Sequence, residues 1–167
     1  MSPPSLSASV FASLGPGSSM DVPQVGAPTW ALVVSLLLAA LVVLLSMVPL
    51  GAARAQADFS LADLAAPRAM FDRLPAWGQR ANWAHQNCFE AFNLHAPACL
   101  LVLVSGPSGL IAPVLLVAAA LLHPALRLVY VAAYVADIPL LRSLSWAAGL
   151  LCSGLLYSEG LVACLAR

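Results

Sequence analysis

Residues 79–90 read Gln-Arg-Ala-Asn-Trp-Ala-His-Gln-Asn-Cys-Phe-Glu, within a predicted helix that runs from about 76 to 104 and is long enough to span a bilayer. At about 100° per residue, one face of that helix carries Arg80, Trp83, Asn87 and Glu90. Ionisable groups inside a membrane span are costly and usually face the helix bundle or a wet cavity. The stretch therefore predicts a transmembrane helix that presents a polar stripe to its neighbours.

The composition indicates that lipid surrounds most of this chain. Of its 167 residues, 62% are hydrophobic and 8% are charged, whereas about 25% are charged in a typical soluble domain. The mean hydropathy is +0.93. The formal net charge is +0, so the charge balance gives no indication of a nucleic-acid partner. These values exclude a soluble globular domain and predict an integral membrane protein.

Four apolar segments predict four transmembrane helices, at about residues 30–51, 76–104, 110–136 and 140–166. The predicted fold class is all-α, a membrane bundle of four helices within residues 29–167. Residues 1–28 are rich in Ser, Pro and Gly, and we expect a disordered or processed leader there. The run Ala-Arg-Ala-Gln-Ala at 53–57 is typical of a signal-peptide cleavage site, so a cleaved first helix stays an alternative to the retained helix that we favour.

The arginines predict the orientation of the bundle. The first connection carries Arg54, Arg68 and Arg73, and Arg142 follows the third connection. The leader and the second connection hold no basic residue. By the positive-inside rule, the first and third connections face the cytoplasm and both termini face the opposite side.

The last two helices supply polar side chains that complement the stripe of the second helix. Three of these side chains are spaced i, i+3 and i+7 on the third helix, and two open the fourth helix: Arg127, Tyr130 and Tyr134, then Arg142 and Ser143. We expect Arg127 to satisfy Glu90 across the bundle, because a carboxylate within the membrane needs a cation or several donors. Guanidinium groups, phenols and an amide gathered near one membrane face would hold a small anion through bidentate contacts to its carboxylates.

A purely structural role is the competing interpretation of these residues. Interhelical hydrogen bonds and a pair between Arg127 and Glu90 can stabilise a bundle without binding any ligand. The sequence contains no HxxxH or ExxH pair, so it predicts no metal site. A transporter or channel is the weaker third interpretation, because the chain shows no inverted repeat and has few helices.

Several motifs resemble one family of membrane proteins. The second helix carries Arg80-Ala81-x-x-Ala84-His85-x-Asn87-x-x-Glu90, which resembles the second-helix signature of the MAPEG family, the membrane-associated proteins of eicosanoid and glutathione metabolism. The preceding run Leu74-Pro75-Ala76-Trp77 is similar to that of bacterial-type members. Two further runs are similar to the third and fourth helices of the family: Arg127-x-x-Tyr130-x-x-x-Tyr134, and then Pro139-Leu140-Leu141-Arg142-Ser143. The resemblance covers roughly residues 30–166.

The resemblance implies a four-helix bundle that assembles as a homotrimer and binds glutathione, as co-substrate, between subunits on the cytoplasmic side. Carried over by position, the glutathione contacts would be Arg80, Asn87, Glu90, Arg127, Tyr130 and Tyr134. Arg142 and Ser143 would be the catalytic residues that activate the thiol, since a nearby cation favours the thiolate. The implied activity is glutathione transferase or peroxidase chemistry on a lipophilic substrate that arrives through membrane lipid. The alternative function is a non-catalytic membrane assembly or partner-binding protein that retains the fold.

Some positions depart from the family's pattern. Trp83 stands where several characterised members have an arginine, and Trp146 stands where several have a tyrosine that contacts glutathione. Tyr130 stands where one branch has a histidine. The family's arginine in the first helix corresponds loosely to Arg54. These departures concern the ligand site, whereas the hydropathy pattern of the fold is unaffected.

Overall fold

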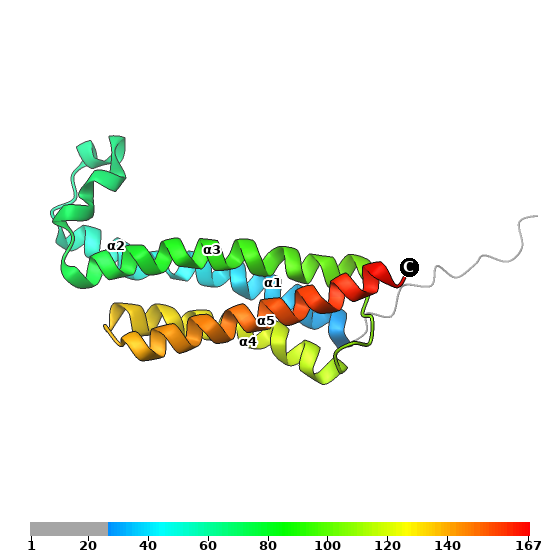
Figure 1. Cartoon of the computed structure of the whole chain (residues 1–167). Coiled ribbons are helices and arrows are strands. Elements are labelled where there is room, and N and C mark those ends of the chain that lie inside the picture. The colour runs from blue at the N-terminus through cyan, green and yellow to red at the C-terminus, as the bar shows by residue number, and fades with distance from the viewer. Residues whose placement is uncertain (1–26) are drawn as a thin grey trace, which may run out of the picture.

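The computed structural model describes residues 27–167, which form helices joined by short connections (Figure 1). The α-helices of this part are α1 (Ala27–Leu45), α2 (Met47–Gln56), α3 (Ala76–Ser105), α4 (Pro113–Val135) and α5 (Pro139–Leu165). Two short 3₁₀ segments, η2 (Leu61–Ala65) and η3 (Pro67–Arg73), lie in the first connection. Four helical stretches are long and apolar enough to cross a membrane: 28–56, α3, α4 and α5. The prediction of an all-α bundle with four membrane-spanning helices is therefore confirmed. The predicted leader, apart from residues 27 and 28, lies outside the described residues.

The first span is longer than its apolar run indicated. The Ser46 backbone N–H donates to the Val42 carbonyl at 2.9 Å, and the Ser46 hydroxyl donates to the Val43 carbonyl at 2.6 Å. These bonds carry the helical path from α1 into α2, which ends at Gln56. The polar connection was expected to begin at about residue 52, and that boundary was wrong because residues 52–56 are helical.

Small side chains allow α1, α3, α4 and α5 to pack closely. The main core cluster joins residues of all four helices: Leu32, Ala98, Cys99, Val102, Leu116, Ala119, Ala120, Cys152 and Leu156. Membrane helices associate largely through such close van der Waals contacts, because lipid provides little hydrophobic drive between them. Gly78 allows α3 to lie close to α2, since an added Cβ would lie 2.5 Å from the Ala53 Cβ.

A buried carboxylate organises the second connection. Glu159 on α5 is fully buried, and its oxygens accept hydrogen bonds from the backbone N–H groups of Ser108 at 2.6 Å and of Gly109 and Ile111 at 2.9 Å. This connection draws residues 110–112 out of the helix, so α4 begins at Pro113 and not at 110 as predicted. Glu159 did not feature in the sequence interpretation.

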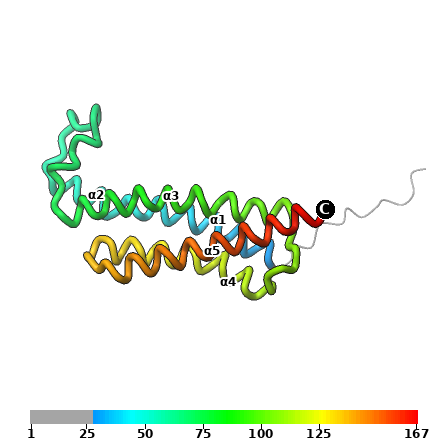
Figure 2. Tube along the Cα trace, in the orientation of Figure 1, coloured from blue at the N-terminus to red at the C-terminus, as the bar shows by residue number. Residues whose placement is uncertain are grey.

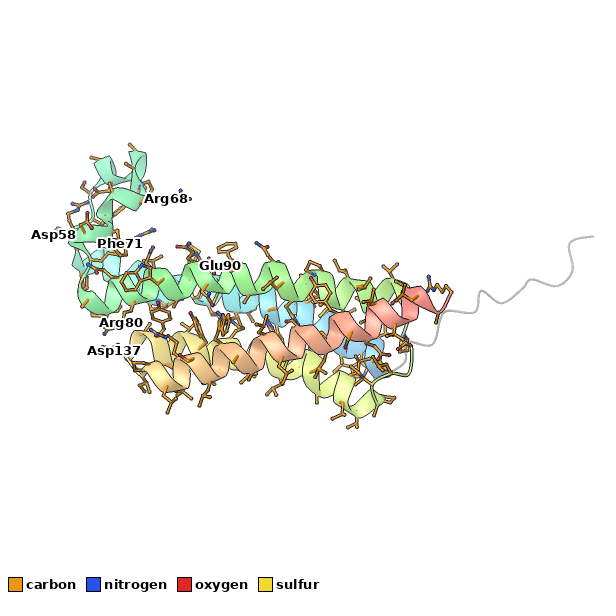
Figure 3. All side chains as sticks on the ribbon, viewed as in Figure 1. Asp58, Arg68, Phe71, Arg80, Glu90 and Asp137 are labelled. Carbon is orange, nitrogen blue, oxygen red and sulfur yellow. The ribbon has the colours of Figure 1, made fainter. Side chains whose placement is uncertain are left out.

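The first and third connections lie at one end of the bundle, and the second connection lies at the other end with the C-terminus (Figure 1). The Cα trace shows the segment with η2 and η3 leaving the bundle at the first of these ends (Figure 2). Arg80 and Asp137 also lie there, with Arg80 Nη1 3.5 Å from Asp137 Oδ2 (Figure 3). The relative placement of the connections thus agrees with the pattern of arginines.

Candidate functional site

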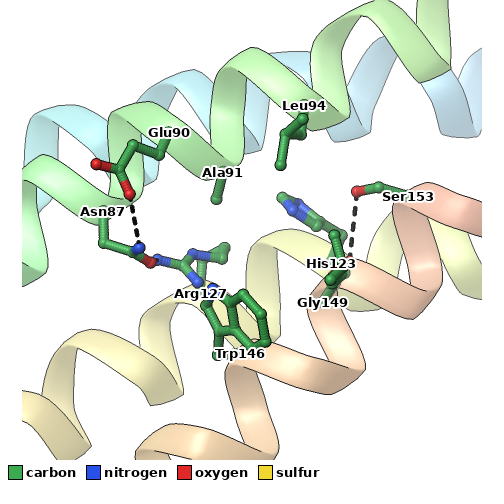
Figure 4. Close-up of a pocket in the computed structure, with 10 residues that line it drawn as sticks. Asn87, Glu90, Ala91, Leu94, His123, Arg127, Trp146, Gly149 and Ser153 are labelled. Atoms are coloured by element: carbon green, nitrogen blue, oxygen red, sulfur yellow. Dashed lines mark hydrogen bonds between the residues drawn. The ribbon is translucent and has the colours of Figure 1, made fainter.

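The polar stripe of α3 is continued by a buried arginine of α4. Arg127 is 3% exposed, and its Nη2 donates to Asn87 Oδ1 at 2.8 Å. Asn87 Nδ2 in turn donates to Glu90 Oε2 at 2.9 Å (Figure 4). The prediction that Arg127 pairs directly with Glu90 was wrong. Arg127 reaches α3 at the level of Asn87, and Glu90, nearly one helical turn further along, is exposed.

Two aromatic rings connect Arg127 to the start of α5. The Arg127 guanidinium carbon lies 4.0 Å from the centroid of the Tyr130 ring, and that of Arg142 lies 4.7 Å from the Tyr134 centroid. The two tyrosine rings meet edge to face, with their centroids 5.4 Å apart. Cation–π contacts of this kind are stronger where water is excluded. The predicted residues of α4 and Arg142 of α5 therefore form one continuous cluster.

Two cavities adjoin the Asn87–Glu90 pair, and both residues line both of them. The outer cavity has a volume of about 380 Å³ and is lined by Trp83, Gln86, Asn87, Glu90, Tyr130 and Tyr134. The inner cavity has a volume of about 150 Å³ and is lined by Asn87, Glu90, Ala91, Leu94, His123, Arg127, Trp146, Gly149, Leu150 and Ser153 (Figure 4). The site therefore combines a polar, open part with a smaller part that reaches between α3 and α5.

Two of the predicted site residues lie apart from the cluster. Arg80 Nε and Nη2 donate to the Val135 carbonyl at 3.4 and 3.3 Å, so this side chain joins α3 to the end of α4. Ser143 is exposed on α5 and lines neither cavity. The structure thus gathers the other six predicted side chains: Asn87, Glu90, Arg127, Tyr130, Tyr134 and Arg142.

Two buried histidines form a feature that the sequence did not reveal. His95 and His123 stack in parallel, with ring centroids 3.6 Å apart and planes 2° apart. His95 Nε2 lies 2.8 Å from Ser35 Oγ, and His95 Nδ1 lies 3.1 Å from Ser153 Oγ. The two histidines lie on different helices, α3 and α4, so no periodicity pairs them. Their positions inside apolar spans were the available signal. Residues 27–167 contain no group of three or more metal-binding side chains.

A basic groove lies on the side of α3 that faces α2 and η3. It has a volume of about 680 Å³ and is lined by Met47, Leu50, Arg54, Pro67, Arg68, Phe71, Leu74, Asn82, Trp83, His85, Gln86 and Phe89. His85 Nδ1 lies 2.7 Å from Ser46 Oγ, so the ring also links α3 to the junction of α1 and α2. The groove shares Trp83 and Gln86 with the outer cavity, so the two hollows flank the same edge of α3.

The MAPEG family is the family whose model matches this sequence, over residues 31–162. The chain belongs to the MAPEG family. Members of the MAPEG family include glutathione transferases and related enzymes. No curated protein and no solved structure matches the chain. The matched range contains the whole cluster around Asn87 and Arg127, so the resemblance of its motifs to the MAPEG family is confirmed.

Proposed function

We propose that this MAPEG protein binds glutathione as co-substrate and uses its thiol to conjugate or reduce a lipophilic substrate. The observation that carries the proposal is the continuous cluster formed by Asn87, Glu90, Arg127, Tyr134 and Arg142 beside the outer cavity. These side chains come from α3, α4 and α5, and their functional groups complement a zwitterionic peptide. A cluster serving only to hold helices together would not need an open cavity at its edge.

The charges of the cluster match those of glutathione, which carries two carboxylates, an ammonium group and a thiol. The guanidinium groups of Arg127 and Arg142 complement carboxylates, which arginine binds in bidentate fashion. The exposed carboxylate of Glu90 complements the ammonium group, and Asn87 fixes one of its oxygens at 2.9 Å. Binding would thus use both signs of charge in the cluster, with Glu90 lining the outer cavity and the two arginines lying behind its tyrosines.

Arg142 is the residue that we propose activates the thiol. A cation beside a thiol lowers the cost of the thiolate, which is the nucleophile. In a transferase reaction, the sulfur forms a bond to an electrophilic carbon, the leaving group departs with its electron pair, and the thiol proton passes to solvent. Arg142 packs over Tyr134, which fixes the guanidinium at the edge of the cluster.

Three polar residues of α3 favour assembly with further copies of the chain. Gln86, Glu90 and Asn93 are exposed in a helix that is long enough to cross the membrane. Polar groups that face lipid within a membrane span are costly, so contact with a neighbouring subunit would be more favourable for them than contact with lipid. In a homotrimer of the kind that the resemblance implies, the basic groove of one subunit would close the open outer cavity of the next. Glutathione would then enter from the cytoplasm, at the end that holds the first and third connections.

The competing proposal is a non-catalytic assembly protein that retains the fold. Trp83 favours it, because the indole lines the outer cavity between Phe71 and Tyr134, with ring centroids 5.6 and 6.5 Å apart. A large aromatic side chain there takes up space that a peptide ligand would use. Under this proposal the contact of Arg127 with Asn87 serves only the stability of the bundle.

An activity screen separates these proposals. Protein purified in detergent would be assayed for glutathione-dependent turnover of chlorodinitrobenzene and of cumene hydroperoxide. The transferase and peroxidase proposal expects turnover of at least one substrate, lost in Arg142→Ala and kept in Arg73→Ala, whose side chain lies in the first connection. Absence of turnover in a well-folded wild-type protein would favour the non-catalytic role.

A further inference from the structure

A lateral groove lies between the first span and the C-terminal end of α4. It has a volume of about 340 Å³ and is lined by Val42, Leu45, Ser46, Pro49, Leu128, Val131, Ala132, Val135 and Ala136. Leu45 and Leu128 are 44% and 47% exposed, so the groove is open towards the surroundings of the bundle. It shares no lining residue with the outer cavity, the inner cavity or the basic groove. The lateral groove is therefore separate from the site proposed for glutathione.

Small side chains on both helices create the lateral groove. Ala132 and Ala136 are spaced i, i+4 at the end of α4, and Ser46 and Pro49 are spaced i, i+3 on the first span. Residues at these spacings are neighbours on one helical face, so each pair leaves a shallow strip on its helix. The lining residues of α4 extend over about 12 Å at about 1.5 Å per residue. The result is an elongated slot that runs along the helices.

The interior of the lateral groove is apolar. Ser46 is the one polar side chain among the lining residues, and it is 2% exposed. Its hydroxyl donates to the Val43 carbonyl at 2.6 Å, so it is already satisfied. The volume is more than twice that of an engineered apolar cavity of about 150 Å³ that binds benzene, so roughly a dozen carbon atoms would fit. An elongated apolar slot of this size suits part of a hydrocarbon chain.

An ion pair lies where the lateral groove ends. Arg80 Nε and Nη2 donate to the carbonyl of Val135, a lining residue, at 3.4 and 3.3 Å. Asp137 directly follows the lining residue Ala136, and its Oδ2 lies 3.5 Å from Arg80 Nη1 (Figure 3). The span formed by α4 ends at Val135. The pair therefore lies near the level at which the hydrocarbon core of a bilayer gives way to the headgroups.

Both members of this pair are accessible to a headgroup. The side chains of Arg80 and Asp137 are 24% and 61% exposed. The guanidinium has five N–H donors, more than its contacts with Val135 and Asp137 use, and arginine binds phosphate oxygens well. The carboxylate accepts hydrogen bonds from a primary ammonium group. A choline headgroup has no N–H to donate, and a glycerol headgroup has no cation to offset the carboxylate.

We propose that the lateral groove holds an acyl chain of a phospholipid whose headgroup carries a phosphate and a primary ammonium, as in phosphatidylethanolamine, with the phosphate on Arg80 and the ammonium on Asp137. Two observations carry this choice of occupant: the groove is apolar and open to lipid, and opposite charges lie together at its end. The inference goes beyond the proposed glutathione chemistry and does not depend on it.

Native mass spectrometry of the full chain tests the proposal. The protein would be purified in detergent, depleted of lipid and titrated with ethanolamine, choline and glycerol phospholipids that carry the same dioleoyl chains. The spectra count the bound lipids and give an affinity for each. We expect the wild type to bind the ethanolamine phospholipid about tenfold more tightly than the other two, as expected for one hydrogen bond to a charged group. Equal affinities would overturn the headgroup assignment.

Asp137→Asn tests the role of the carboxylate. Asp137 has a φ of 59°, and asparagine also adopts this left-handed conformation, so the variant should keep the backbone and lose the charge. We expect the ethanolamine preference to disappear and the anionic glycerol phospholipid to bind best, because Arg80 is then unopposed. Asp58→Asn is the matched control, since Asp58 is also exposed and has a φ of 51°. An unchanged preference in Asp137→Asn, or the same change in Asp58→Asn, would contradict the proposal.

Ala132→Leu tests the groove itself, because the added side chain would occupy it from an exposed position. Ala118→Leu is the matched control, since Ala118 is exposed on the same helix and does not line the groove. We expect about tenfold weaker ethanolamine phospholipid binding in Ala132→Leu, the effect of leaving about two methylene groups unburied, and wild-type binding in Ala118→Leu. Melting temperatures verify that both variants are folded. Equal binding in the two variants would overturn the proposal, and a changed oligomeric mass in Ala132→Leu with unaltered lipid binding would assign the groove to a second copy of the chain.

Discussion

Arg127 Nη2 donates to Asn87 Oδ1 across 2.8 Å, so an amide of α3 and not a carboxylate holds the buried guanidinium of α4. This relationship leaves Glu90 exposed, and within residues 27–167 its carboxylate is held on one oxygen by Asn87 alone. Asn87 and Glu90 therefore have different roles in the cluster. Asn87 joins the helices, whereas Glu90 is available to a ligand at the outer cavity.

Asn87→Ala should destabilise the bundle. It removes one acceptor of the buried Arg127 guanidinium, and leaving a buried donor unsatisfied costs about 1–3 kcal/mol. The measurement is the melting temperature in detergent. Asn93→Ala is the matched control, because Asn93 is an exposed asparagine on the same helix. Equal melting temperatures for the two variants would contradict the joining role of Asn87.

Glu159→Gln should destabilise the protein more than Glu90→Gln does. The Glu159 carboxylate accepts three backbone hydrogen bonds with both oxygens, whereas the glutamine amide offers one acceptor oxygen and turns its NH2 group, itself a donor, towards a backbone N–H. The loss should amount to about 1–3 kcal/mol for a donor left unsatisfied. Glu90 is exposed, so its substitution serves as control. Thermal unfolding in detergent would measure both, and an unaffected Glu159→Gln would show that the second connection does not depend on this carboxylate.

Gly78→Ala should weaken the contact between α2 and α3. Its Cβ would lie 2.5 Å from the Ala53 Cβ, so α2 must shift. Overpacking of this kind costs about 1–3 kcal/mol. Gly51→Ala, with nothing within 4 Å of its Cβ, should be neutral or slightly stabilising because alanine favours the helix. A comparison of melting temperatures tests the pair, and a tolerated Gly78→Ala would contradict the close packing of these helices.

Asp63 in the first connection should titrate below its usual range. The Ser60 backbone N–H, and then the Ser60 hydroxyl and Arg73, lower the pKa of Asp63 from 3.8. Because the folded pKa is lowered, these contacts stabilise the connection at neutral pH and are lost as the pH falls through the lowered value. NMR titration of the Asp63 carboxyl carbon should give a midpoint below 3.8. Ser60→Ala, which keeps the backbone N–H, should raise the midpoint only part of the way, and a wild-type midpoint at or above the usual value would refute the account.

Much of the fold was predictable because hydropathy alone determines which segments can span a bilayer. The structure has its four spans where the apolar runs lie, and the helix boundaries deviate from the predicted ones by a few residues. Residues 52–56 continue the first span as α2, although their composition is typical of a connection. Residues 110–112 leave the predicted third helix because Glu159 organises the second connection, and no local pattern indicates a contact so distant in sequence.

The site was predictable as a set of residues but not as a network. Helical spacing placed Asn87 and Glu90 on one face and Arg127 on another helix, which limited the candidates to a few polar groups. Whether Asn87 or Glu90 meets Arg127 depends on how far α3 is shifted along its axis relative to α4. The helical periodicity of the sequence does not determine that shift. The stacking of His95 on His123 depends on the same shift, which is why it was missed.

Calorimetric titration of the purified protein with glutathione tests the central claim most directly. The account predicts saturable binding in the millimolar range or tighter for the wild type. It predicts lost or much weaker binding in Arg142→Ala and Glu90→Gln, and unchanged binding in Arg73→Ala. No heat of binding at millimolar glutathione in a folded wild-type sample, or equal binding in Arg142→Ala and Arg73→Ala, would contradict it.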